Sequence, residues 1–265
     1  MLSLHRVALL ALAIAALAAA PATAKTSKPT VVLVHGAFAD ASGWNGVIDQ
    51  LEHRGYKVIA APNPLRGVSA DAASLRDFLS TISGPIVLAG HSYGGVVITN
   101  AATGNPNVKA LVYIAAFAPD QGDSVLSLSE LGTDDELGPA ALDIRPYPNA
   151  DGTHGQEGYI KLDLFRRIFA GDLDRKLARQ MALTQRGASL VALGEPSGPP
   201  AWKTIPSYYM VAGEDRTIGT DVEVAMAKRI KPRKTVTVRG ASHVVMISQP
   251  RKTTDLILDA VKSVR

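Results

Sequence analysis

The chain contains no cysteine in its 265 residues. It can therefore form no disulfide, so its stability must come from a packed core, and thiol catalysis and zinc–thiolate sites are excluded. Basic residues are also not strongly clustered. The net charge is only +4, and the one loose basic group, residues 228–234, lies between a helical pattern and a strand pattern, as expected for a solvated helix end. Nucleic-acid binding is therefore not expected.

The sequence also lacks an apolar run long enough to cross a bilayer. Residues 7–20 are apolar, but they fall short of the roughly 20 residues that a membrane-spanning helix needs. The run follows Arg6 and precedes Ala22-Thr23-Ala24, a small-residue pattern typical of a cleavage site. We expect residues 1–24 to be a signal peptide cleaved after Ala24. The predicted product is a periplasmic or secreted protein with no stable membrane anchor.

Beyond residue 25, short apolar segments alternate with helical patterns. Strands are predicted at residues 30–35, 57–60, 85–89, 108–114, 207–212 and 235–238. Helices are predicted at residues 44–54, 69–83, 93–103, 222–230 and 253–264. This alternation indicates an α/β fold with a mainly parallel sheet and helices on both faces.

The alternation stops between residues 118 and 200, a stretch rich in Gly, Pro, Asp and Ser. Amphipathic helical patches fall near residues 158–170 and 172–185, and no strand pattern interrupts the stretch. Because it is too long for a plain loop in a compact domain, we expect an inserted helical cap over the carboxyl edge of the sheet. Residues 25–117 and 201–265 would then form one core domain.

The most informative motif joins the third predicted strand to the helix after it. It reads Gly90-His91-Ser92-Tyr93-Gly94. A serine on a sharp strand-to-helix turn is the nucleophile elbow of serine hydrolases, and the glycines remove side chains that would collide with nearby backbone. The alternative is a glycine-rich turn with an incidental serine.

Two more polar residues follow later strands. Asp215 comes after the strand at 207–212, and His243 comes after the strand at 235–238. Since the carboxyl ends of parallel strands meet at one edge, Ser92, Asp215 and His243 are expected to lie together as nucleophile, acid and base. Their chain order, Ser-Asp-His, is that of α/β hydrolases.

Other residues compete for two of these roles. Glu214 is the neighbouring alternative acid, and Asp120 is a remoter one. Among the other histidines, His91 lies inside the elbow, where its side chain must point away from the nucleophile. His53 and His154 fall on an exposed helix face and in the cap, and they are weaker candidates for the base.

Donors for a developing oxyanion are expected after the first strand. Gly36 allows the backbone to approach closely there, so we predict that the N–H groups of Ala37 and Tyr93 form the oxyanion hole. The alternative is that these residues only lead the chain out of the first strand.

A substrate pocket is expected between the sheet edge and the cap. Its candidate apolar walls, for which ordinary core packing is the alternative, are Phe38, Phe117, Phe165, Phe169 and Trp202.

Taken together, these segments resemble the α/β-hydrolase superfamily. The chain is most similar to the branch that holds plant methylesterases, hydroxynitrile lyases and their bacterial esterase relatives. The matching segments are VLVHGA at 32–37, GHSYGG at 90–95, AAFAPD at 115–120, GEDRTI at 213–218 and ASHVVM at 241–246. The resemblance implies a Ser92–Asp215–His243 triad and an oxyanion hole at Ala37 and Tyr93.

Departures from the branch bear on its two activities. Hydroxynitrile lyases place threonine after the first histidine and lysine after the last, where this chain has Gly36 and Val244. The lysine stabilises departing cyanide, which valine cannot do, so the resemblance favours ester hydrolysis. The branch often has proline at the position of Gly219, in the acid loop.

The sequence thus predicts an exported serine esterase that cleaves small to medium carboxylic esters through an acyl-enzyme intermediate, with no metal or cofactor. Its expected partner is a small-molecule ester; the oligomeric state is left open, with a homodimer as one alternative. Other activities considered are a receptor-like binding protein of the same fold, a hydroxynitrile lyase and a cofactor-free haloperoxidase. Serine at the elbow, in place of aspartate, excludes a haloalkane dehalogenase.

Overall fold

The computed structural model describes residues 28–264, so the predicted signal peptide lies outside the described residues. The central element is a parallel sheet of six strands in the order β2-β1-β3-β4-β8-β9. The strands are β1 (Thr30–Val34), β2 (Val58–Ala61), β3 (Ile86–Ser92), β4 (Val108–Ala116), β8 (Ser207–Ala212) and β9 (Lys234–Val238). Each corresponds to a predicted strand, and their parallel pairing confirms the α/β architecture.

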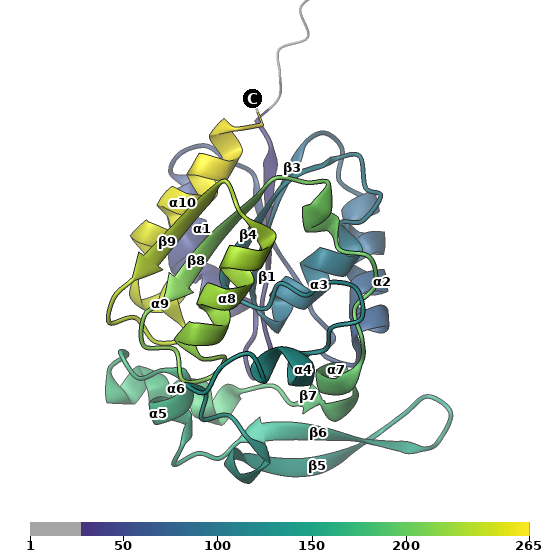
Figure 1. Cartoon of the computed structure of the whole chain (residues 1–265), viewed down its shortest axis with the longest axis vertical. Helices are drawn as coiled ribbons and strands as arrows, with labels where there is room; N and C mark the ends of the chain where they lie inside the picture. The colour runs from purple at the N-terminus through teal and green to yellow at the C-terminus, as the bar shows by residue number, and fades with distance from the viewer. Residues whose placement is uncertain (1–27, 265) are drawn as a thin grey trace, which may run out of the picture.

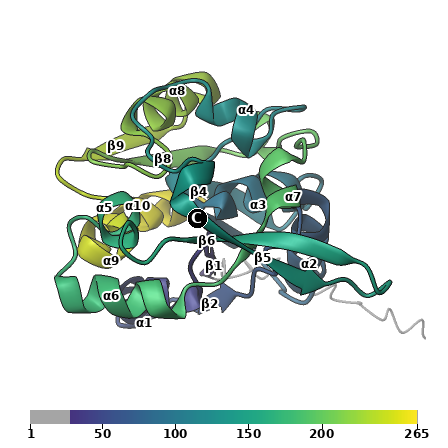
Figure 2. The same cartoon turned by 90° about the horizontal axis from the view of Figure 1, so that it is seen from below.

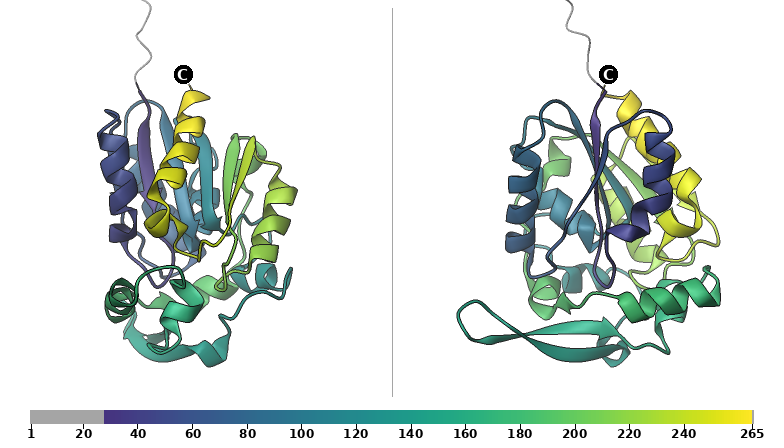
Figure 3. Two further views of the ribbon diagram at one scale, coloured as in Figure 1. Left: turned by 90° about the vertical axis from the view of Figure 1, so that its left-hand side faces the viewer. Right: turned by 180° about the vertical axis from the view of Figure 1, so that it is seen from behind.

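Helices cover both faces of this sheet (Figures 1 and 3). On one face α1 (Asn45–Glu52) packs against α10 (Pro250–Lys262), beside the short α9 (Val245–Ser248). On the other face α2 (Val68–Ser80) packs against α3 (Tyr93–Ala101), with α8 (Thr220–Ile230) over β8. Because both faces are covered, every residue of β1 and β3 is buried, which explains their continuous apolar runs.

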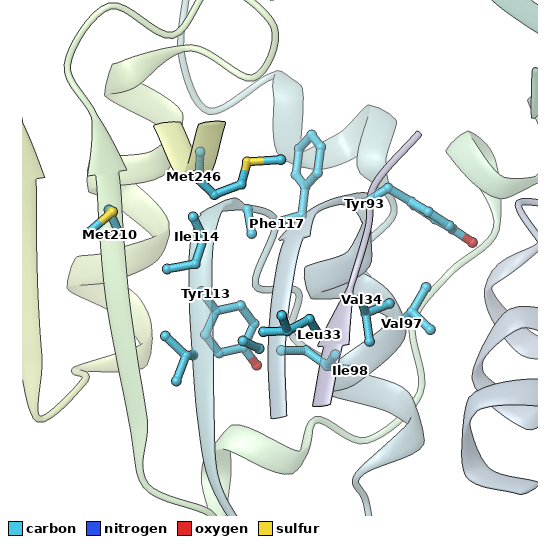
Figure 4. Close-up of a cluster of buried hydrophobic side chains, with 14 of the residues drawn as sticks. Leu33, Val34, Tyr93, Val97, Ile98, Tyr113, Ile114, Phe117, Met210 and Met246 are labelled. Carbon is cyan, nitrogen blue, oxygen red and sulfur yellow. The ribbon is translucent and has the colours of Figure 1, made fainter. Parts of the chain in front are cut away.

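The elbow strand is longer than predicted. β3 ends at Ser92, three residues beyond the predicted end at Ala89, so the serine is the last residue of the strand. A register shift between His91 and Ser92 brings Ser92 opposite Ala116 of β4. Figure 4 shows Phe117, the residue after β4, at the same end of the buried cluster as Met246, whereas Tyr113 lies deeper. This end of the sheet carries the predicted site.

Residues 118–200 lie across the carboxyl edge of the sheet, as Figure 2 shows from below. Both predicted helices are present, but each is shorter than predicted. The helical elements are α4 (Val125–Ser129), η2 (Pro139–Ala141), α5 (Phe165–Phe169), α6 (Arg175–Thr184) and α7 (Leu190–Gly194), and η3 (Ala201–Lys203) follows. The remainder includes an antiparallel sheet of β5 (Leu142–Pro148), β6 (His154–Ile160) and β7 (Ala188–Ser189). The expectation of a purely helical insertion is therefore wrong.

Glycine and proline concealed this small sheet from a pattern-based prediction. β5 carries Pro146 and Pro148, and β6 carries Gly155, all of which are rare inside strands. A Cβ at Gly155 would lie 2.4 Å from the Tyr147 ring of β5, so a larger residue there would have to displace that ring. In the described part of the chain, no helix has the length and hydropathy to cross a membrane.

Candidate active site

Ser92 occupies a strained backbone position between β3 and α3. Its φ of 55° and ψ of −128° lie in a region that residues with a Cβ rarely adopt. The neighbouring glycines make the turn possible because other backbone comes very close. A Cβ at Gly94 would lie 2.6 Å from the Val34 carbonyl oxygen, and one at Gly36 would lie 2.5 Å from the Ser92 Cβ. The geometry is that of a nucleophile elbow.

His243 and Asp215 form a fully buried pair. His243 Nδ1 donates to Asp215 Oδ2 at 2.6 Å, and neither side chain is exposed. The other carboxylate oxygen, Oδ1, accepts the backbone N–H groups of Thr217 (2.7 Å) and Ile218 (3.0 Å). Burial alone would raise the pKa of Asp215, but the positive charge and hydrogen bond of His243 and the backbone amides outweigh it and hold that pKa well below its usual range.

The pairing determines which nitrogen of His243 can accept a proton. An ionised carboxylate only accepts hydrogen bonds, so Nδ1 carries the hydrogen and Nε2 is left as the acceptor. Nε2 is buried and has no hydrogen-bond partner among residues 28–264, Ser92 Oγ included. In structures without substrate the hydrogen bond between nucleophile and base is often long and tightens on binding.

The alternative acids lie elsewhere. Glu214 is exposed on the same loop, and Asp120 is ion-paired with Lys203 at 2.5 Å. Of the three predicted candidates, the structure brings Asp215 to His243.

His91 supports the loop that carries His243. Its Nε2 lies 2.9 Å from the His243 carbonyl oxygen, and the two rings are 4.6 Å apart. A carbonyl only accepts, so Nε2 carries the hydrogen. Burial, together with the charge of His243, lowers the pKa of His91 well below its usual value, so the ring is neutral. As expected from its place in the elbow, His91 points away from the cavity, and its hydrogen bond helps to position the backbone of His243.

Ala37 and Tyr93 border the same cavity as Ser92. Tyr93 is the first residue of α3, where the backbone N–H has no partner within the helix. Its hydroxyl donates to the buried Asp71 at 2.9 Å, and Asp71 also accepts the N–H of Arg66 at 3.0 Å. These bonds anchor the Tyr93 side chain away from Ser92 and leave its backbone at the cavity.

Hydrogen bonds also hold the loop that contains Ala37. His35 Nδ1 donates to the Gly36 carbonyl at 2.9 Å, and its Nε2 accepts the Asn63 N–H at 3.3 Å. Asn63 Nδ2 in turn donates to the His35 carbonyl at 2.9 Å. Burial lowers the pKa of His35, so a neutral imidazole keeps these two ring contacts. The adjacent Phe38 has a φ of 58°, a second strained residue at the site.

A cavity of about 330 Å³ lies in front of Ser92. Phe38 and Phe117 line it, as predicted, and the insertion supplies most of the other walls. These apolar walls are Val125, Leu126, Leu137, Pro139, Leu142, Ile144, Leu190 and Leu193. Among the described residues that line the cavity none is charged, and the polar side chains are those of Ser92, Tyr93, Ser129 and Thr217.

The other predicted aromatic walls have different neighbours. Trp202 lies outside the cavity, which corrects the prediction: its Nε1 donates to the Pro119 carbonyl at 2.8 Å, and Lys203 lies over its ring. Phe165 is fully buried against Phe169, whose ring centroid lies 4.9 Å from that of His243. Phe169 therefore packs against the His243 imidazole.

One residue at the site was not predicted. Glu223 of α8 is fully buried, and its Oε2 accepts the Ala212 N–H at 3.0 Å. Burial and then the charge of Asp215 raise the pKa of Glu223 well above its usual value, which favours the protonated carboxyl. A glutamate directly beside Val222, on the buried face of α8, is the sequence signal that could have identified it.

The described residues contain no cluster of three or more His, Asp or Glu side chains that could hold a metal ion.

Comparison with known proteins agrees with the fold. The alpha/beta hydrolase family matches residues 31–256. A pyrethroid hydrolase of Sphingobium wenxiniae is 29% identical over 247 residues, which cover 86% of each chain. Methylesterase 9 of Arabidopsis thaliana is 28% identical over 255 residues, covering 86% of this chain and 96% of that protein. The crystal structure of polyneuridine aldehyde esterase shares the fold with a TM-score of 0.75 at 20% identity, covering 88% of this chain and 99% of that one.

Proposed function

The chain belongs to the alpha/beta hydrolase family, and on that premise we propose that it is an exported serine esterase acting on neutral, apolar carboxylic esters. One observation carries the proposal above the others. The buried Asp215–His243 pair leaves an unpartnered Nε2, within the same site as a strained serine at the floor of an apolar cavity. Relatives that span most of the chain are named as hydrolases and esterases.

The proposed reaction is acyl transfer through Ser92. Its Oγ attacks the ester carbonyl while His243 Nε2 takes the hydroxyl proton, and Asp215 stabilises the resulting imidazolium. The N–H groups of Ala37 and Tyr93 stabilise the oxyanion. His243 then gives the proton to the leaving alkoxide, and a water molecule that it deprotonates hydrolyses the acyl-enzyme. The products are the carboxylic acid and the alcohol, with Ser92 restored.

The cavity indicates the substrate class. Because its described lining is uncharged and mostly apolar, a carboxylate or ammonium on the substrate would lose its hydration without gaining a partner. A neutral ester with a bulky apolar part suits these walls. The similarity to a protein named as a pyrethroid hydrolase supports the same class.

The residues next to the triad favour hydrolysis over cyanohydrin cleavage. Val244, which follows His243, is fully buried and offers no positive charge to a departing cyanide. A side chain at Gly36 would have to displace Ser92, since its Cβ would come within 2.5 Å of the serine Cβ. Neither position supports lyase chemistry.

A comparison of Ser92→Ala with Ser129→Ala tests the proposal. Ser129 lines the same cavity but takes no part in the proposed reaction, so its loss should leave kcat/KM for p-nitrophenyl butyrate within a few fold. Losing Ser92 removes the nucleophile and should lower kcat by about 10⁴-fold or more. Rates of p-nitrophenol release measure both effects. Equal activity of wild type and Ser92→Ala would overturn the proposal, and no activity in either protein would instead favour a non-catalytic binding role.

A further inference from the structure

Exposed large apolar side chains are concentrated on the insertion. In the described part of the chain six such side chains are more than 40% exposed, and all of them lie between residues 126 and 191. They are Leu126, Leu131, Ile144, Leu162, Leu183 and Val191. The remainder of residues 28–264 contributes none, although it holds nearly all of the apolar core.

Four of these side chains lie on, or directly beside, elements that line the Ser92 cavity. Leu126 of α4 and Ile144 of β5 line the cavity and are still 57% and 44% exposed, so each passes from its wall to the surface. Val191, 58% exposed, lies on α7 next to a lining residue, and α7 packs against α4. Leu131, 49% exposed, lies just beyond the end of α4. We call these four residues the apolar rim.

The rim is continuous with the interior. The side chains of Leu190 and Ile144 both approach Gly158 of β6, where a Cβ would lie 3.6 and 3.7 Å from them. α7 and the β5–β6 hairpin therefore form one apolar surface that runs from the cavity walls outward. An apolar patch that surrounds a binding cavity generally marks a site of interaction.

The remaining two exposed leucines have different surroundings. Leu162 borders a surface cleft lined by Arg166, Arg167, Arg175 and Arg179, and Leu183 lies on α6, which forms another wall of that cleft. Neither leucine lines the Ser92 cavity, and Asp163 borders the cleft together with the four arginines. The two leucines provide a matched control for the rim.

We propose that the apolar rim adsorbs the enzyme to the surface of a condensed phase of its own substrate, such as a droplet of a water-insoluble neutral ester. The inference rests on the proposed function and on the continuity between rim and cavity. An ester apolar enough to fill an uncharged cavity is poorly soluble, so most of it is present as a separate phase. Contact between the rim and that phase lets the ester enter the cavity without being dissolved in water, and it removes the four side chains from water.

The test compares the double variant Leu131→Ser/Val191→Ser with Leu162→Ser/Leu183→Ser, since none of these residues lines the Ser92 cavity. Adsorption is read as the protein left in the aqueous phase after mixing with a tributyrin emulsion. Hydrolysis is followed as tributyrin passes its solubility limit. The rim variant should lose about tenfold in adsorption and in rate on the emulsion. It should keep its rate on dissolved p-nitrophenyl acetate, and the control variant should match wild type throughout.

Adsorption is also measured in the Ser92→Ala background, which separates this inference from the esterase proposal. Rim-dependent adsorption that persists in Ser92→Ala shows that it does not need turnover. If the protein with Ser92 intact also hydrolysed neither ester, rim-dependent adsorption would support the rim proposal and overturn the esterase proposal. Equal adsorption of the rim and control variants, with normal hydrolysis of dissolved ester, would overturn the adsorption proposal and leave the esterase proposal intact. Sedimentation supplies a further decisive result: a wild-type dimer that the rim substitutions convert to monomer would assign the rim to a second copy of the chain.

Discussion

Two buried carboxyl groups lie side by side at the site, and their pKa values are shifted in opposite directions. His243 and the amides of Thr217 and Ile218 donate hydrogen bonds to Asp215, whereas Glu223 accepts one backbone N–H and lies beside the negative charge of Asp215. Burial therefore dominates at Glu223 and raises its pKa, while the charge and hydrogen bonds of its partners lower the pKa of Asp215. The opposite pKa shifts concentrate the negative charge on Asp215, next to the His243 imidazole that it would stabilise when protonated.

The substitution Glu223→Gln should therefore be tolerated, because glutamine is neutral and nearly isosteric with the protonated acid. In wild type the pKa of Glu223 in the folded chain lies above its ordinary value of 4.5, so above pH 4.5 the unfolded chain binds fewer protons than the folded chain. This glutamate consequently lowers the stability by up to about 1.4 kcal/mol for each pH unit between the unfolded and folded pKa. The variant should retain esterase activity and show a smaller loss of stability from pH 5 to pH 9.

Urea unfolding at pH 5, 7 and 9 measures this difference. Glu214→Gln, at an exposed position one residue before Asp215, is the matched control and should follow wild type. A Glu223→Gln protein with the same pH dependence as wild type would show that Glu223 is ionised in the native state.

At the scale of elements, the site depends on how closely β1, β3 and α3 approach one another. The start of α3 lies against the end of β1, where the atoms nearest to a Cβ at Gly94 would be the carbonyl oxygens of Val34 (2.6 Å) and His35 (2.9 Å). These are backbone atoms of a central strand, which cannot rotate away as a side chain would. The strained conformation of Ser92 is thus held by the packing of a helix against a strand.

Gly94→Ala should force α3 and β1 apart. The expected loss of stability is about 3 kcal/mol, as for other overpacked core positions, with most of the esterase activity lost as well. Gly171→Ala is the control, since the atoms nearest to its Cβ would lie 3.7 Å away or farther. Thermal unfolding and kcat/KM of both variants provide the measurement. A stable, fully active Gly94→Ala enzyme would contradict the close packing described here.

At the scale of the molecule, the insertion and the core hold each other through polar contacts next to the site. Arg66 of the core binds Glu157 of β6 at 2.7 Å and lies 4.2 Å from the centre of the Tyr147 ring. Arg186, which follows α6, donates to the Asn63 carbonyl at 3.2 Å beside His35. These contacts bring the cap sheet and α7 over Ser92, and the cavity walls come from both parts.

The molecule also buries two neutral histidines, His35 and His91, whose pKa values are lowered by burial. As the pH falls below 6.5, the ordinary pKa of histidine, the unfolded chain binds protons that the folded chain does not. The free energy of unfolding should therefore decrease on acidification, by up to about 1.4 kcal/mol per pH unit for each histidine. His91→Gln keeps a donor near the His243 carbonyl and should remove about half of this dependence.

Urea unfolding at pH 7.5, 6.5 and 5.5 measures the dependence. His154→Gln, at an exposed position of β6, should leave it unchanged. Identical slopes for His91→Gln and wild type would mean that His91 is protonated in the native state.

Much of the core fold and several features of the site could be predicted because their causes are local. A strand buried on both faces is apolar along its length, and parallel strands bring their carboxyl ends to one edge. Ser92, Asp215 and His243 could be predicted because each comes after a strand of the parallel sheet. Gly36 and Gly94 were identified because a close backbone approach requires them.

Other features depend on residues distant in the chain. Asp215 and Glu214 are neighbours in the sequence, yet the loop buries the first and exposes the second. Trp202 and Phe117 are both large aromatic residues, and only the folding of the insertion places Phe117 at the cavity and Trp202 outside it. The cap sheet and the protonation of Glu223 arise likewise from contacts across the chain. Local patterns record the neighbours of a residue in sequence, whereas burial and charge depend on its neighbours in space.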